Sequence, residues 1–564
     1  MKIYYRNILL LAVVVFMIQA CNQTDLDLRV SPNDLAANAA DPNLLLTSIQ
    51  IAYAGNQESL AGLSARMTRI DYFFGRDYFN SLPGNTLDGV WRRTYSSGTT
   101  VIGDSDVNGV AVGILTNLQA LEDANANGTV DLSFHEGVAK TLYAHSLFQL
   151  VDFIGQAAFS QAGNSSEFPS PMLDSGEEVY DAAFGLLDEA EALFGTDPST
   201  NGATDLFYGG NNDAWVKLIN TIRLRSYVLT GNKTAFDAII EGDNYISSIE
   251  DDLQLQYGTS ELQPDNRHPD FADDYRSDGA NIYQSNWLMA LMLENDDPRR
   301  RYYFYRQVDG TPGALDVNGV FVEPNEEELA CSLVVPPEQY EGLPYCAVNA
   351  GYWGRSHGND EGTPPDGFRR TAVGVYPAGG RFDDNSFGVV GFGAGGAGAG
   401  IEPILLSSYV EFWKGIMAST DAEKAGFLRS GLEQSIAKVQ SFGSLDAEAD
   451  LSLAADEDAV TAYIDGIVAE YEGATGDAKE NVFAEQYFTT LFGGATEAYN
   501  YYRLTGYPTS LLPNWEPNPG PFPRTLLIPQ NEVINNPMVD QKTDLTTQVF
   551  WDTNPASPAF PSAN

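Results

Sequence analysis

Apolar residues recur at helical spacing over most of this 564-residue chain, and signals for strands are few. In the segment Trp215–Arg225, for example, Trp215, Ile222 and Arg225 fall on one helical face. Helices are predicted over residues 44–53, 60–72, 109–125, 132–150, 177–194, 212–230, 404–418, 423–442, 457–473 and 479–504. Successive helix pairs of this length predict a mostly α fold, an α-α superhelix in which each pair buries its face on the next.

Two parts of the chain lack this periodicity. Residues 251–403 are rich in Asp, Asn, Pro, Gly and aromatic residues, and the tail 509–564 is rich in proline. We therefore expect a single domain over residues 43–564, with helical parts at 43–250 and 404–508. The first stretch then forms a loop-rich insert, and the tail lies across a surface as irregular coil.

The N-terminus has the composition of an export signal. Lys2 and Arg6 precede an apolar run, Ile8–Ile18, that is too short to span a bilayer as a mature helix. Cys21 follows the small residue Ala20, as at a bacterial lipoprotein processing site. We expect a signal peptide at residues 1–20, and a lipidated Cys21 that begins a polar tether ending at residue 42. The alternative is an ordinary secretory signal with an incidental cysteine.

Composition narrows the possible ligands. The chain has 77 acidic and 31 basic residues, a formal net charge of −46. Such a surface repels phosphate backbones, which argues against nucleic-acid binding, and it disfavours polyanionic ligands. Hydrophobic residues make up 43% of the chain, which is enough for a packed core.

The remaining cysteines, Cys331 and Cys346, flank a proline-rich loop. A disulfide between them suits an oxidising exterior, and closing a loop of this length contributes about 3 kcal/mol in the chain-entropy model. Zinc binding is disfavoured because no further Cys or His stands at ligand spacing. We expect no metal and no cofactor.

Two motifs resemble ligand loops but lack an essential part. The glycine run Gly391–Gly400 has no Lys-Ser/Thr of a phosphate loop, and we interpret it as a flexible loop. The segment Asp123–Asp131 begins like a calcium loop, yet Phe134 stands where a bidentate Glu is required. A solvated turn is the expected structure there, with a distorted site that uses Glu136 as the alternative.

Several blocks, taken in order, resemble the SusD/RagB family, most closely its SusD-like second branch. The strongest is Glu497-Ala-Tyr-Asn-Tyr-Tyr-Arg503, followed by Gly506-Tyr-Pro and Pro523-Arg524. The other blocks are Leu150–Gly155, Tyr208–Arg225, Asn295–Arg306, Gly351–Asp360 and Ile528–Asn536. The ordered set spans essentially residues 21–550.

This resemblance implies an outer-membrane lipoprotein of the Bacteroidetes type that captures nutrients. It implies helical tetratricopeptide-like pairs with a loop-rich subdomain, and a SusC-like TonB-dependent barrel as partner. The lipid-anchored protein would face the exterior and deliver its ligand to the barrel. The activity implied is binding without bond cleavage, so the chain is not expected to be an enzyme.

A sugar-binding surface needs flat aromatic rings beside amide and charged groups. Two clusters supply them: Asp71–Asn80 with Trp91–Tyr95, and Tyr283–Trp287 with Tyr352–His357. The residues predicted to contact a ligand are Trp91, Tyr95, Tyr283, Trp287, Tyr352, Trp353, Arg355 and His357. Tyr72, Phe73 and Phe74, at the end of a predicted helix, are expected in the core instead.

The favoured ligand is an oligosaccharide, but peptides and other organic oligomers use the same aromatic and amide contacts. A surface-tethered glycoside hydrolase and a purely structural lid are further alternatives. The four histidines, His135, His145, His268 and His357, are scattered and form no known catalytic motif.

Overall fold

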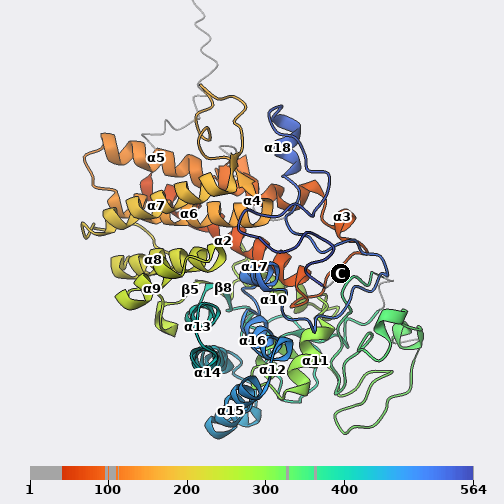
Figure 1. The fold of residues 1–564 in the computed structure, drawn as a ribbon. Coiled ribbons are helices and arrows are strands. Elements are labelled where there is room, and N and C mark those ends of the chain that lie inside the picture. The colour runs from red at the N-terminus through yellow and green to blue at the C-terminus, as the bar shows by residue number, and fades with distance from the viewer. Residues whose placement is uncertain are drawn as a thin grey trace, which may run out of the picture. The chain divides into compact units, whose positions relative to one another are not determined.

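Helices dominate the computed structural model, in which strands are few and short (Figure 1). The structure describes residues 41–95, 99–100, 110–111, 113–325, 329–360 and 365–562. The predicted signal peptide and the lipidation site at Cys21 lie outside these residues. Residues Pro42–Asn564 form one compact unit.

The α-helices in the described part of the chain are α2 (Pro42–Met67), α3 (Tyr78–Ser81), α4 (Asp88–Tyr95), α5 (Ile114–Asn127), α6 (Ser133–Ile154), α7 (Gly176–Phe194), α8 (Asn212–Thr230), α9 (Lys233–Gly242), α10 (Pro269–Asp274), α11 (Asn286–Glu294), α12 (Arg300–Tyr303), α13 (Ser407–Ile416), α14 (Asp421–Gln440), α15 (Glu457–Gly473), α16 (Asp477–Thr490), α17 (Thr496–Thr505) and α18 (Gln530–Asn535). Short 3-10 helices occupy Gly84–Leu87, Ile249–Asp251, Ala330–Leu333, Glu338–Tyr340, Ser441–Leu445 and Leu451–Leu453. The strands are β1 (Thr99–Thr100), β2 (Val110–Ala111), β3 (Gln156–Ala157), β4 (Asp174–Ser175), β5 (Leu253–Gln256), β6 (Phe304–Tyr305), β7 (Ala372–Val373) and β8 (Ile401–Leu405).

Local sequence signals set several helix ends. Helix α7 begins with a capping box, in which Ser175 and Glu178 satisfy each other's backbone N–H groups. Thr420 and Glu423 do the same at α14. Helices α6, α8 and α17 each end at a glycine in the left-handed region, a conformation that costs other residues free energy.

The long helices pack in sequence. Helices α5, α6 and α7 lie side by side, α8 follows on α7, and α13, α14, α15 and α16 continue the stack (Figure 1). Helix α17 returns to pack on α2. This arrangement confirms the predicted mostly α fold of tetratricopeptide-like helix pairs.

A two-stranded antiparallel ribbon stands at the base of the loop-rich insert. Strand β5 lies at the start of the insert and β8 at its end, and Leu253 pairs with Leu405 while Gln256 pairs with Ile401. The glycine run 391–400 is a bonded turn and not the free loop expected, because Gly396 and Gly398 donate backbone hydrogen bonds to the carbonyls of residues 380 and 379. Glycine is required where these two backbones approach so closely.

Two helix predictions were wrong in extent. The predicted helices 44–53 and 60–72 are one continuous helix, α2. The predicted helix 479–504 is two helices, α16 and α17, because the chain turns at Gly493, whose φ is +87°. The proline-rich tail is irregular apart from α18, and many of its apolar residues are buried in the main core, although Ile534 and Met538 are exposed.

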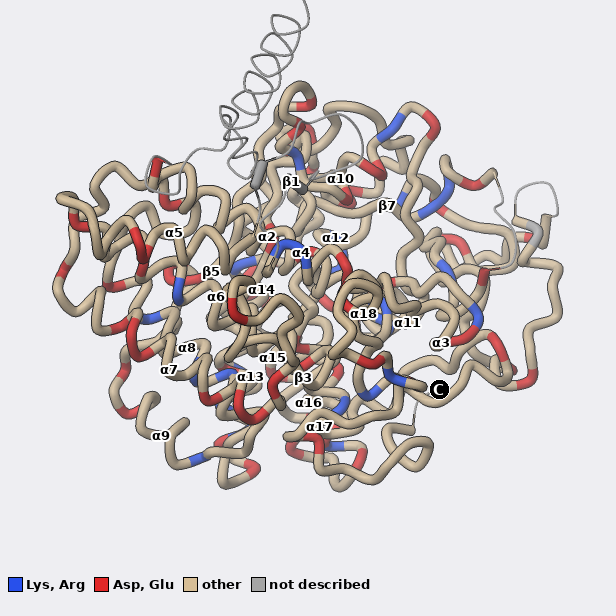
Figure 2. Tube along the Cα trace, turned by 90° about the horizontal axis from the view of Figure 1, so that it is seen from above, with Lys and Arg blue, Asp and Glu red and all other residues tan. Residues whose placement is uncertain are grey.

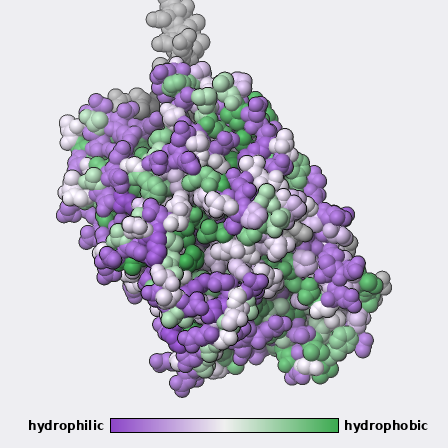
Figure 3. Space-filling model, viewed as in Figure 1, coloured by the Kyte–Doolittle hydropathy of each residue, from purple (hydrophilic) through white to green (hydrophobic). Residues whose placement is uncertain are grey.

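No helix in the described ranges combines the length and the apolar character needed to cross a membrane. Acidic positions outnumber basic ones and are distributed along the trace (Figure 2). The face seen in Figure 3 is mostly hydrophilic, with hydrophobic residues in smaller groups.

A buried ionic network joins three helices and the tail. Arg225 on α8 donates from Nε to Glu497 on α17, at 2.7 Å, and from Nη2 to Asp152 on α6. Burial by itself lowers the pKa of Arg225, but the two carboxylates hold this pKa well above its usual value. Trp551, in the tail, donates its indole N–H to Asp152 at 2.9 Å.

Arg503 on α17 and Arg524 in the tail extend this network. Arg503 donates to the backbone carbonyls of Asp152, at 2.8 Å, and Arg524, at 2.6 Å. The Arg524 guanidinium in turn pairs with the buried Asp552. The residues that carry the family resemblance at positions 152, 225, 497, 503 and 524 therefore meet in one place.

Substituting Arg225→Met should destabilise the fold by about 3–5 kcal/mol, because it leaves two buried carboxylates without their counter-charge. The measurement is chemical denaturation followed by circular dichroism. The control is Lys233→Met, which breaks an exposed pair with Asp237 and should cost about 0.5 kcal/mol or less. Equal losses in the two variants would contradict the role given to Arg225.

Candidate functional site

The loop that follows α2 meets the loop-rich insert. In this segment, residues 71–79 (the α2 loop), Asp71 forms an isolated antiparallel bridge with Gln284, and the carbonyl of Phe73 accepts the N–H of Gly358 at 3.0 Å. Ser285 pairs with Arg355 beside them. Parts of the two predicted aromatic clusters, separated by about 200 residues or more, therefore lie side by side.

The two phenylalanines of the α2 loop have opposite environments. Phe73 is buried and stacks on His357 with ring centroids 5.0 Å apart, whereas the Phe74 side chain is 65% exposed. The core position expected for Phe74 is therefore wrong. Adjacent residues of an extended segment point to opposite sides, so burial of one ring exposes the other.

His357 has a structural place under this loop. Its Nε2 lies 3.0 Å from the hydroxyl of Tyr78, and its backbone carbonyl accepts the N–H of Trp515. Burial holds the pKa of His357 well below its ordinary value, and the nearby positive charge of Arg69 lowers it further. The ring is therefore neutral at physiological pH.

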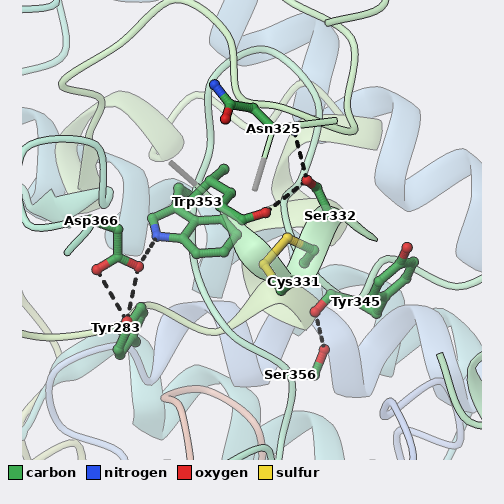
Figure 4. Close-up of a disulfide and its surroundings, with 10 residues drawn as sticks. Tyr283, Asn325, Cys331, Ser332, Tyr345, Trp353, Ser356 and Asp366 are labelled. Carbon is green, nitrogen blue, oxygen red and sulfur yellow. Dashed lines mark hydrogen bonds between the residues drawn. A yellow bond between two sulfur atoms is a disulfide. The ribbon is translucent and has the colours of Figure 1, made fainter. Parts of the chain in front are cut away.

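A buried carboxylate organises the next layer. Asp366 accepts the indole N–H of Trp353 at 2.7 Å and the hydroxyl of Tyr283 at 2.9 Å (Figure 4). Arg370 donates to the same carboxylate at 2.6 Å and lies over the ring of Tyr283. These four residues, called the Asp366 cluster below, hold Trp353 and Tyr283 facing inward.

The disulfide lies next to this cluster (Figure 4). Cys331 and Cys346 are joined, with their Cα atoms 5.7 Å apart, as the sequence analysis expected. Cys346 packs with Tyr283 and Trp353 in a small hydrophobic core of the insert. The disulfide thus ties the proline-rich loop to the residues that support the α2 loop.

The buried Arg355 and the half-buried Tyr72 connect the Asp366 cluster to the surface. The guanidinium of Arg355 lies 4.9 Å from the ring of Tyr283 and 5.7 Å from that of Tyr72. The two rings contact each other edge to face, and the Tyr72 hydroxyl donates to the carbonyl of Asn359. Tyr72 is thereby held between the buried layer and solvent.

The outermost groups include both donors and acceptors. Arg76, whose side chain is 60% exposed, donates from Nε to Asp360 at 2.8 Å and lies 3.9 Å from Glu516. Together with Tyr72 and Phe74 they form what we call the exposed face. An exposed aromatic ring beside charged hydrogen-bonding groups is the composition of a binding surface for polar, flat-faced ligands.

The eight residues predicted to contact a ligand fall in different places. Tyr283, Trp353, Arg355 and His357 lie together beneath the exposed face, all buried. Tyr352 is also buried, and it packs under the guanidinium of Arg306. In this conformation these five side chains pack against other protein groups. A direct ligand contact for each of them stays a prediction.

The other three lie elsewhere. Trp91 is buried and donates its indole N–H to Glu532 on α18, at 3.1 Å, and its ring contacts Tyr95, which is half-buried. Trp287 lies on α11 and contacts Phe488. Neither group is connected to the exposed face by a described contact, so their part in binding also stays a prediction.

Comparison with known proteins identifies the family. Residues 35–325 match the model of the SusD-like second family, described as starch-binding and associating with the outer membrane. The chain belongs to this family. A search of curated proteins found no match.

Solved structures show the same fold. A chitin-binding protein has a TM-score of 0.61 at 18% identity, covering 91% of this chain and 100% of its own. A SusD/RagB family protein from Bacteroides thetaiotaomicron gives 0.61 at 15% identity, covering 93% of this chain and 100% of its own. A chitin-binding SusD homologue from Flavobacterium johnsoniae gives 0.54 at 16%, covering 91% and 99%.

Replacing Asp366 by Ala should cost about 3 kcal/mol, because it leaves the buried Arg370 unpaired and removes the acceptor for Trp353 and Tyr283. Tryptophan fluorescence should also change as Trp353 loses its fixed position. Urea denaturation and emission spectra measure both effects. Asp278→Ala, at an exposed position of the same insert, should change stability by about 0.5 kcal/mol or less.

Proposed function

We propose that this protein is a lipid-anchored, surface-exposed outer-membrane protein that captures oligosaccharides without cleaving them. It delivers them to a SusC-like TonB-dependent barrel. The family match over residues 35–325 is the observation that carries this proposal, since that family is described as starch-binding and outer-membrane associated. Two of the structures that share the fold are chitin-binding proteins, which favours a carbohydrate over a peptide.

The chemistry of the exposed face supports a sugar ligand. A pyranose ring has an apolar face of C–H groups, which an exposed ring such as Phe74 can cover. Its hydroxyls need both donors and acceptors, and Arg76 offers donors while Asp360 and Glu516 offer acceptors. Most of the aromatic rings beneath are fixed by hydrogen bonds or packing, so binding requires little ordering of the face.

The N-terminal sequence supports the location. The apolar run Ile8–Ile18 and the cysteine at position 21 suit lipoprotein processing, and two or more acyl chains anchor a protein stably. The partner barrel follows from family membership, and the excess of acidic residues makes a polyanionic cargo unfavourable.

Phe74→Ala should weaken binding of the preferred oligosaccharide about 5- to 30-fold, equivalent to about 1–2 kcal/mol, because the sugar loses its apolar contact. Calorimetry on the protein beginning at residue 22, over a panel of neutral oligosaccharides and peptides, gives the affinities. Phe392→Ala is the matched control, since that ring is 57% exposed but lies in the glycine run. An equal effect of both changes would place the site elsewhere.

Chromatography of the same mixtures tests the absence of cleavage. Recovery of each oligosaccharide unchanged is expected, and any product would make the protein a hydrolase.

Cys21→Ala should release the protein from the membrane fraction of the native host, because it removes the acylated residue. Fractionation followed by immunoblotting measures the distribution. The double variant Cys331→Ser with Cys346→Ser should stay in the membrane fraction, since these residues form a disulfide within the domain. A Cys21→Ala protein that stays membrane-bound would refute the lipid anchor.

A further inference from the structure

A groove between helices α11, α15 and α16 lies apart from the exposed face. Its volume is about 320 Å³, and the insert and the tail close its remaining side. Its walls combine apolar residues, among them Leu291, Ile467 and Val482, with polar ones such as Gln486 and Ser510. Trp287, one of the predicted ligand contacts, lies in the same wall.

Trp287 is only 5% exposed, and its ring makes an edge-to-face contact with Phe488. Its indole N–H has no hydrogen-bond partner among the described residues, and neither has that of Trp515. The other five tryptophans, Trp91, Trp215, Trp353, Trp413 and Trp551, each donate one hydrogen bond from the indole N–H. The Trp287 nitrogen is not fully enclosed, and Trp287 lines the groove. A free donor at the wall of a groove needs an acceptor from a ligand or from solvent.

Three carboxylates, one from each helix, border the groove: Glu294, Glu470 and Glu485. No Lys or Arg lines it, and none of the three forms an ion pair in the described part of the chain. Burial raises the pKa of Glu485, and the charges of Glu470 and Glu294 raise it further, while Ser510 donates to it at 2.5 Å. The groove therefore has a negative potential that no internal cation neutralises.

The carboxylates do not suit a metal ion. Within the described ranges, no group of three or more His, Cys, Asp or Glu residues is placed to hold one. Charges spread over three walls instead suit an extended ligand that carries its own positive charges. Apolar side chains beside an N–H donor and several acceptors suit a ring that has both a C–H face and polar substituents.

We propose that this groove is a second carbohydrate subsite, and that it selects amino sugars with protonated amines, such as glucosamine oligomers, over their neutral N-acetylated forms. This inference rests on the proposed function, since it specifies the class of sugar bound. The ring of one residue lies on the apolar wall and a hydroxyl or ring oxygen accepts the Trp287 N–H. The ammonium groups lie at Glu470 and Glu485.

Calorimetry at low ionic strength, with glucosamine tetramer and N-acetylglucosamine tetramer as probes, tests the preference. The wild-type protein should bind the glucosamine tetramer about tenfold more tightly, and the difference should shrink in 0.5 M salt because charges are screened. Equal affinity for the two probes, with binding of neutral sugars retained, would overturn this inference and leave the proposed function intact. Failure to bind any sugar would instead remove the proposed function.

Variants locate the preference in the groove. Glu470→Gln with Glu485→Gln should abolish most of the tenfold difference. Glu472→Gln, which makes the same charge change as Glu470→Gln alone but at an exposed position of α15 that does not line the groove, should leave it within about twofold. Trp287→Phe keeps the packing on Phe488 but removes the N–H donor, and should weaken the glucosamine tetramer about fivefold.

Glu470 is exposed, so Glu470→Gln alone provides a variant that should fold normally. An unchanged preference in the two glutamate variants would refute the site. Competition by trilysine at the same concentration as the sugar would assign the groove to basic peptides and so refute the sugar assignment.

Discussion

The guanidinium of Arg225, enclosed between the carboxylates of Asp152 and Glu497, is the interaction on which the helical fold depends most. The three residues come from α6, α8 and α17, which are separated by up to 345 positions in sequence, and none has access to water that would replace a missing partner. Buried charges of this kind are costly when any member is absent, so the network specifies one arrangement of these helices. Trp551 and Arg503 attach the tail to the same point. The family-block residues at positions 152, 225, 497, 503 and 524 thus encode one buried structure.

The burial of Phe73 and the exposure of Phe74 in the α2 loop follow from this architecture. The end of α2 is held by the core, and the insert supports it from the other side through His357 and the Asp366 cluster. Nearly all the tryptophans and tyrosines in this region are therefore used for support. In the proposed function, the exposed face offers a ligand a small number of side chains held by buried contacts, which favours moderate affinity with little ordering on binding.

Most of the helical fold was predictable from the sequence, because strong apolar stripes identify helices directly. The ranges 212–230 and 457–473 were predicted with the bounds that the structure shows. Helix α2 was predicted as two helices because Asn56 and Gln57 interrupt its apolar pattern. Both residues are buried: Asn56 forms a hydrogen bond with Thr94, and Gln57 with Gln149. These tertiary hydrogen bonds stand at helix positions where an apolar side chain would be expected from the sequence alone.

The candidate site was predictable only in part. The sequence identified the aromatic clusters, but the contact between Phe73 and His357 spans more than 280 positions and has no local signal. For the same reason, composition could not show that Trp353 would face a buried carboxylate while Phe74 faced solvent. The excess of acidic residues predicts a preference against anions, but the three carboxylates of the groove come from separate helices that only folding brings together.

The β5–β8 ribbon has a consequence for how this protein can change over time. The segment from residue 257 to residue 400 begins and ends at the paired strands β5 and β8. Its two ends therefore lie close together in the helical stack, whatever the length of the segment. The entropy of closing such a segment grows only with the logarithm of its length, so insertions and deletions in its exposed loops cost the scaffold little. Sequence drift can therefore remodel the region that supports the exposed face while the helices beneath keep their register.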